Sequence, residues 1–125
     1  MKAILLIGIG GGFGSILRYG IGVWSQKIGL APFPLGTVLV NLIGSLLIGL
    51  IYGWMGKQSL IASQEVQFLA ITGFCGGFTT YSAFSYDTLA LMEKGHYSTA
   101  IGYVLVTLLA GWSLVYLGYL TIQKI

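Results

Sequence analysis

The sequence is poor in charge, cysteine and proline. Only 7% of its 125 residues are charged, and 56% are hydrophobic, whereas roughly a quarter of the residues in soluble domains are charged. Six Lys and Arg residues are also too few for a nucleic-acid-binding patch. The single cysteine, Cys75, excludes an intramolecular disulfide. The composition therefore predicts an integral membrane protein without a separate soluble domain.

The apolar residues form four runs, each long enough to cross a bilayer, which requires about 20 residues in a helix. The predicted spans are residues 3–24, 35–55, 65–92 and 100–122. The first run resembles a signal peptide, but it continues to Trp24 without a clean cleavage site, so we interpret it as a span. We predict one all-α transmembrane domain over residues 1–125, with the prolines Pro32 and Pro34 outside the helices.

Small residues recur four positions apart within these spans. Pairs with this spacing allow helix backbones to approach closely in lipid, and they are Gly8/Gly12, Gly10/Gly14, Gly49/Gly53 and Gly73/Gly77. They serve either helix packing within the chain or contact between subunits. Since four helices cannot easily enclose a pore, we expect the chain to oligomerise.

Positive charges are divided equally between the two sides of the predicted topology. With four spans both termini share one side, and the six basic residues fall into two groups of three: Lys2, Lys57 and Lys124 against Arg18, Lys27 and Lys94. An excess of Lys and Arg on one side normally sets the orientation of a membrane protein. Without that excess, the chain is predicted to insert in both orientations, so that two copies could pair antiparallel.

The third span contains the unusual stretch GFCGGFTTYSAFS, residues 73–85. The pair Gly76–Gly77 lowers helix propensity by about 1 kcal/mol per glycine, and the hydroxyl side chains that follow can bond back to the backbone. We predict a break in this helix rather than a packing kink. Non-helical backbone at membrane depth is tolerated where it lines a cavity, and its free carbonyl oxygens can coordinate Na⁺.

The second span has a polar stripe. Asn41 lies near its middle, with Thr37 and Ser45 four residues away on either side, on the same helical face. The stripe either forms hydrogen bonds between helices or lines a path for an ion. In the second case the neutral amide of Asn41 can donate hydrogen bonds to an anion without trapping it.

Other polar and aromatic residues could serve either the packing and anchoring of the helices or a pathway for an ion. Tyr81 and Phe84 either pack or present the positive edges of their rings to an anion. Arg18 either reaches the headgroups or forms a cationic vestibule. Tyr103 and Thr107, four residues apart in the last span, either pack or extend a polar track.

Enzyme functions find no support in the sequence. The glycine-rich GIGGGFG near the start fits neither the dinucleotide nor the P-loop pattern. No residue that could act as a general base for Cys75 is evident in the sequence. No cluster of histidines and acidic residues indicates a metal centre. We therefore expect a protein that is not an enzyme.

Three motifs together resemble the Fluc, or CrcB, family of bacterial fluoride channels. They are GGGFGSILRY (10–19), GTVLVNLIGS (36–45) and GFCGGFTTYSAFS (73–85), and the likeness extends over essentially the whole chain. The resemblance implies an antiparallel, dual-topology dimer in the bacterial inner membrane. It also implies two pores that let cytoplasmic fluoride leave passively, which reduces fluoride toxicity.

The resemblance also implies roles for individual residues. The fluoride pathway would be lined by uncharged polar and aromatic side chains from three spans: Asn41, Tyr81, Ser82, Phe84, Tyr103 and Thr107. Arg18 would be the vestibule arginine. The backbone carbonyls of Gly76 and Thr79, repeated in the second subunit, would hold a structural Na⁺ at the dimer centre.

Two positions depart from the pattern of the family. Tyr81 stands where a phenylalanine is usual, and Gly111 stands where another hydroxyl of the polar track is expected. They raise the alternative of a heterodimer with a paralogous chain, although a homodimer is our main expectation. A small multidrug exporter is a weaker alternative, because the first span lacks the carboxylate that proton-coupled export needs, and Asp87 is the only candidate acid within the spans.

Overall fold

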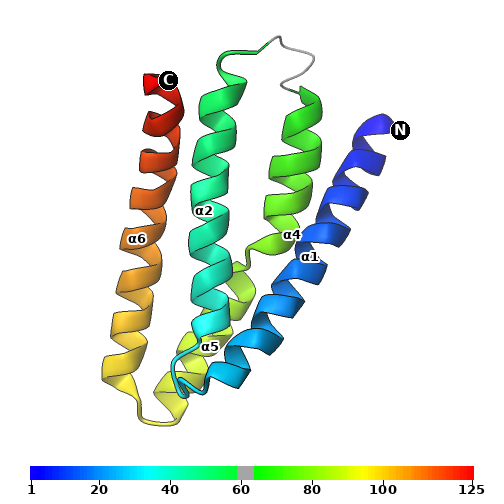
Figure 1. Cartoon of the computed structure of the whole chain (residues 1–125). Helices are drawn as coiled ribbons and strands as arrows, with labels where there is room; N and C mark the ends of the chain where they lie inside the picture. Colours follow the sequence, from blue (N-terminus) through cyan, green and yellow to red (C-terminus); the bar gives the residue numbers. More distant parts are fainter. Residues whose placement is uncertain (59–63) are drawn as a thin grey trace.

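The computed structural model describes residues 1–58 and 64–125, and over these residues the chain forms helices and no β-strand (Figure 1). The elements are α1 (Lys2–Ile28), α2 (Leu35–Met55), η1 (Gln67–Cys75), α4 (Gly76–Phe78), α5 (Tyr81–Glu93) and α6 (Tyr97–Lys124). Within the described residues, α1, α2 and α6 are each long and apolar enough to cross a membrane. Their positions match the first, second and fourth predicted spans, and α1 and α6 extend a few residues beyond the predicted ends.

The region predicted as the third span consists of several consecutive elements. The π-helical η1 leads directly into the short α4, in which the pair Gly76–Gly77 is helical. The next two residues are extended, with φ and ψ of −83° and 162° at Thr79 and of −154° and 118° at Thr80. Helical hydrogen bonding resumes in α5 at Tyr81. The backbone thus leaves the helical conformation at the two threonines, just after the glycines.

Glycines in the left-handed conformation follow two of the helices. Gly29 ends α1 with φ of 73°, and Gly95 follows α5 with φ of 78°. At the end of α5 the N–H of His96 donates to the carbonyl of Leu91, and the N–H of Gly95 donates to Met92. These two bonds form a Schellman motif, which satisfies carbonyls that a helix end otherwise leaves free.

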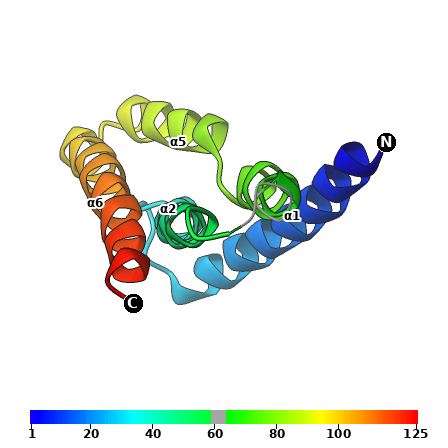
Figure 2. The same ribbon diagram turned by 90° about the horizontal axis from the view of Figure 1, so that it is seen from above.

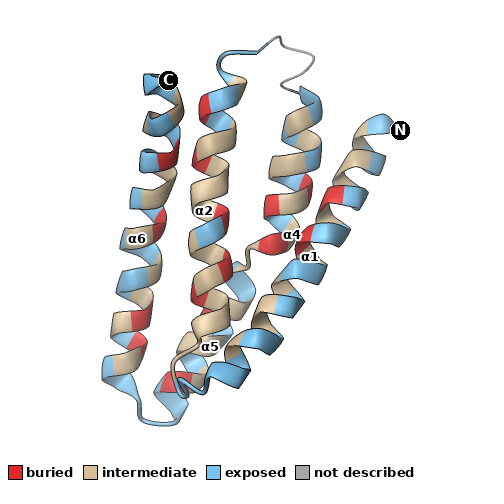
Figure 3. Cartoon of the chain, viewed as in Figure 1, coloured by how far each residue is buried: buried red, intermediate tan, exposed pale blue. Residues whose placement is uncertain are grey.

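The helices pack through their glycines. A Cβ on Gly10 would overlap the carbonyl oxygen of Leu69, and one on Gly14 would overlap that of Phe74. Likewise, Gly49 of α2 touches the backbone of α6 at Val115. These glycines therefore serve close packing within the chain, and Figure 3 shows buried positions concentrated on the facing sides of the helices.

The outer surface of the chain is strongly apolar. Gly8 and Gly12 have no neighbouring atom near their Cβ positions, so their face of α1 is open in a single chain. Large side chains are also exposed, including Phe13 at 65%, Ile4 at 72% and Leu109 at 57%. Such a surface suits contact with lipid or with another transmembrane chain, and it does not suit water.

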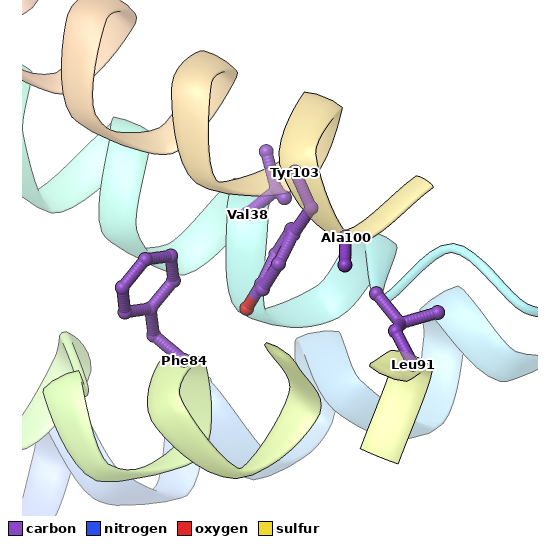
Figure 4. Close-up of a cluster of buried hydrophobic side chains, with 5 residues drawn as sticks. All are labelled: Val38, Phe84, Leu91, Ala100 and Tyr103. Carbon is purple, nitrogen blue, oxygen red and sulfur yellow. The ribbon is translucent and has the colours of Figure 1, made fainter. Parts of the chain in front are cut away.

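A small core holds α5 against α2 and α6. It consists of Val38, Phe84, Leu91, Ala100 and Tyr103, each at most 9% exposed (Figure 4). Seen from above, α5 extends from the side of α1 toward α6, and α2 lies between α6 and α1 (Figure 2). Because lipid is as apolar as these side chains, their close packing stabilises the arrangement chiefly through van der Waals contact.

Both termini lie at the same end of the helices (Figure 1). At this end Lys57 Nζ donates to the carbonyl oxygen of Ile122 at 2.6 Å, and Lys2 forms an ion pair with Glu65. Lys57, which follows α2, therefore lies beside the C-terminal end of α6.

Candidate functional site

A cavity of about 280 Å³ lies between α2, the α4–α5 junction and α6. Its lining contains no charged side chain. The polar contributors are Asn41, Ser45, Thr79, Thr80 and Thr107. The remaining lining is aromatic, aliphatic or glycine: Ile48, Tyr81, Phe84, Leu108, Gly111, Trp112 and Val115.

Asn41 pairs with the extended backbone at Thr80. The N–H of Thr80 donates to Asn41 Oδ1 at 2.8 Å, and Asn41 Nδ2 donates to the carbonyl oxygen of Thr80 at 3.1 Å. These backbone groups lack helical partners because Thr80 is extended, and the side-chain amide satisfies both. The second N–H of Asn41 Nδ2 has no hydrogen-bond partner within the described residues. Asn41 thus both joins two segments and lines the cavity.

The start of α5 is fixed by a side-chain cap. Thr80 Oγ1 accepts a hydrogen bond from the N–H of Ala83 at 3.1 Å, the usual N-cap arrangement. Ser82 Oγ lies 3.2 Å from Thr80 Oγ1. Ser82 is exposed and is not part of the cavity lining in this single chain.

The two aromatic residues of α5 differ in exposure. Phe84 is 9% exposed, whereas Tyr81 is 81% exposed, and both line the cavity. Their ring centroids are 6.0 Å apart. Phe84 also packs against Tyr103, with centroids 5.2 Å apart, and Figure 4 shows these two rings facing one another between α5 and α6. The exposed Tyr81 marks the side on which a single chain leaves the cavity open.

Tyr103, predicted to line the pathway, is fully buried, is not part of the cavity lining and belongs to a second polar cluster. Its hydroxyl donates to Asp87 Oδ2 at 3.3 Å, and Thr37 Oγ1 donates to the same oxygen at 2.6 Å. Asp87 and Thr37 line another cavity, of about 370 Å³, beside the loop between α1 and α2. No motif or spacing in the sequence predicts this cluster. The available signal was that a carboxylate within a span requires hydrogen-bonding partners.

Thr107 has a buried hydroxyl without a hydrogen bond in the part of the chain that the structure describes. Elsewhere on α6, Ser113 and Thr121 donate to the carbonyls of Leu109 and Leu117, both at 2.8 Å. Thr107 does not make the corresponding bond to its own helix. A buried hydroxyl without a partner is unfavourable unless a ligand or water satisfies it, and Thr107 is one of the residues that line the cavity.

Arg18 reaches the α4–α5 junction from α1, where its Nη1 donates to the carbonyl oxygen of Thr79 at 3.3 Å.

Gly76 is exposed. The N–H of Thr80, which would close a continuous helix onto Gly76, donates to Asn41 instead. The carbonyl oxygen of Gly76 therefore does not accept the helical hydrogen bond from Thr80. Carbonyl oxygens of this kind are suitable ligands for a hard cation. Among the described residues, no group of three or more His, Cys, Asp or Glu side chains could hold a metal ion.

These features define a multi-pass helical membrane protein with an uncharged polar cavity among its spans. Residues 5–119 match the family described as "CrcB-like protein, Camphor Resistance (CrcB)". The chain belongs to this family.

Curated relatives cover nearly the full length. A protein of Gloeobacter violaceus is 44% identical over 126 residues, which cover 100% of this chain and 99% of the relative. One of Azobacteroides pseudotrichonymphae is 42% identical over 120 residues, with coverage of 96% and 95%. One of Francisella tularensis subsp. mediasiatica is 42% identical over 125 residues, with coverage of 98% and 95%. Each is named "Fluoride-specific ion channel FluC".

Proposed function

We propose that this chain forms a fluoride-selective channel in the bacterial inner membrane. The channel lets cytoplasmic fluoride leave passively and so reduces fluoride toxicity; it is not an enzyme. The relatives named as fluoride-specific channels support the choice of ion. The observation that carries the proposal is the uncharged cavity together with the buried hydroxyl of Thr107, which has no hydrogen-bond partner among the described residues.

The chemistry of the cavity fits a small, strongly hydrated anion. Such an ion must exchange its water for hydrogen-bond donors, and the free N–H of Asn41 and the hydroxyl of Thr107 are donors of this kind. The ring edges of Tyr81 and Phe84 add weaker positive potential. Because none of these groups is charged, the anion can also leave. A potential of about 100 mV, negative inside, drives each anion outward with about 2.3 kcal/mol.

The functional unit is an antiparallel, dual-topology homodimer with two pores. Support comes from the open side of the cavity, where Tyr81 is 81% and Trp112 is 69% exposed in a single chain. A second copy would close that side. The equal division of basic residues between the two ends supports insertion in both orientations.

The extended residues Thr79 and Thr80 are the break in the third transmembrane helix. We infer that their carbonyls lie at membrane depth, where non-helical backbone is tolerated next to a cavity or a protein interface. Gly76 and Thr79 would hold a structural Na⁺ between the two copies through their carbonyl oxygens, which is consistent with the exposure of Gly76. When bound, the ion would supply positive charge that links carbonyl oxygens of both chains.

The test is fluoride efflux from liposomes that contain only this purified chain. The liposomes are loaded with potassium fluoride, and valinomycin starts the release, with potassium chloride as the matched control. Rapid release of fluoride without comparable release of chloride is expected. No release from a correctly folded dimer would refute a homomeric channel and would favour pairing with a paralogous chain.

A further inference from the structure

Ser45 is a second hydroxyl of the cavity that forms no hydrogen bond to a described residue. It lies one turn after Asn41 on α2 and lines the same cavity. A serine in a helix commonly donates to the carbonyl four residues earlier, as Ser85 does to Tyr81 at 3.0 Å. Ser45 makes no such bond, so its hydroxyl remains available to a ligand.

Ser45 faces the place on α6 where a side chain is missing. A Cβ built on Gly111 would lie 3.5 Å from Ser45 Oγ, an ordinary van der Waals contact. Gly111 is itself buried and lines the cavity. The hydroxyl of Ser45 therefore borders the space that a side chain at position 111 would occupy.

Two available hydroxyls thus follow one another along the cavity, about one helical turn apart. Thr107 precedes Gly111 by one helical turn on α6, and Ser45 lies opposite Gly111 on α2. Ser45 is also the last polar side chain that α2 contributes, since the next lining residue on this helix is Ile48. Beyond this level the lining is aliphatic or aromatic, with Trp112 and Val115 on α6.

We propose that Ser45 Oγ is a ligand of the permeating anion and that it donates from α2 the hydrogen bond that Gly111 cannot donate from α6. It is the final donor of the polar part of the pathway, one helical turn beyond Thr107 and at the boundary with the apolar part. This inference rests on the proposed fluoride channel. It also implies that glycine at position 111 leaves the pore functional, because the missing donor is replaced from the opposite helix.

The test separates the hydroxyl group from the volume that it occupies. Ser45→Ala is expected to reduce fluoride efflux by about tenfold, since a hydrogen bond to a charged group is lost. Ser45→Ala combined with Gly111→Ser should restore efflux to within about threefold of the wild type, a margin allowed for imperfect donor geometry. Ser45→Ala combined with Gly111→Ala adds a similar volume without a donor and should not restore it.

Ser113→Ala is the matched control, because Ser113 is exposed and its hydroxyl donates to the carbonyl of Leu109 on its own helix. Its efflux should equal that of the wild type. All variants are first compared by size-exclusion chromatography and circular dichroism, so that only folded proteins enter the assay.

The outcomes distinguish the role of Ser45 from the function of the channel. Rescue by serine but not by alanine at position 111 supports the assignment. Wild-type efflux from Ser45→Ala, rescue by both residues, or rescue by neither would overturn it while leaving the channel function intact. A wild-type protein that releases no fluoride would refute the proposed function, and the role of Ser45 with it.

Discussion

Replacing Asn41 by aspartate adds a negative charge to the cavity and leaves its shape almost unchanged. In the wild type the side chain accepts from the N–H of Thr80 at 2.8 Å and donates to the carbonyl of Thr80 at 3.1 Å. Aspartate can still accept the first bond. It loses the second, because two oxygen atoms then face each other, and it has no N–H left for an anion.

The expected effect on conduction follows from Coulomb's law. An anion bound at the position served by the free N–H of Asn41 would lie about 4 Å from the new negative charge. At an effective dielectric constant of about 20, two like charges at this distance repel by about 4 kcal/mol. That energy corresponds to roughly a thousandfold change in occupancy, since about 1.4 kcal/mol is a factor of ten. Allowing for screening, efflux should fall by more than about a hundredfold.

The assay is valinomycin-triggered fluoride efflux from liposomes, with Gln123→Glu as the matched control. Gln123 also donates from its amide to a backbone carbonyl, that of Gly53 at 3.3 Å, but it lies near the C-terminus and outside the cavity. The control should conduct normally. If folded Asn41→Asp conducted like the wild type, the anion would not pass Asn41, and the proposed pathway would be wrong.

Three further predictions concern the cavity and the packing of α1. Thr107→Val should lower efflux about tenfold, since it removes a donor to the anion. It should not lower the thermal unfolding temperature, because the buried hydroxyl that it removes has no partner among the described residues. A loss of stability would contradict this. Gly14→Ala should destabilise the fold by about 1–3 kcal/mol in thermal unfolding, because its Cβ would overlap the backbone of Phe74, whereas Gly12→Ala, with open space, should be neutral. Tyr81→Phe should conduct within about twofold of the wild type, a change of under 0.5 kcal/mol, and a large change in efflux would show that the hydroxyl takes part.

Several features of the fold could be predicted from the sequence alone. Length and hydropathy are local properties of a segment, so the positions of α1, α2 and α6 follow from the apolar runs. The glycine pairs Gly10/Gly14 and Gly49/Gly53 mark places of close helix packing, and the structure assigns both to contacts within the chain. The stretch that combines glycines with hydroxyl residues has extended backbone at Thr79 and Thr80, whereas the pair Gly76–Gly77, from which a break was predicted, is helical.

The arrangement of the site was only partly visible in the sequence. Thr37, Asn41 and Ser45 lie on one face of α2, but the three residues contact different groups. Thr37 bonds to Asp87, Asn41 bonds to Thr80, and Ser45 faces Gly111. Periodicity places residues on one face of a helix and does not say what lies opposite.

The sequence by itself determined that the protein is a membrane protein of several apolar helices. A chain with so few charged residues cannot form a surface that is soluble in water. Only the tertiary structure decided which polar groups satisfy one another and which remain free. Asn41 bonds to Thr80, which is 39 residues away in the sequence, and Asp87 bonds to Thr37 of α2, which is 50 residues away. Such pairings depend on how the helices are aligned and rotated against each other. The hydroxyls of Ser45 and Thr107, which have no partner within residues 1–58 and 64–125, are a result of that alignment, and no local pattern identifies them.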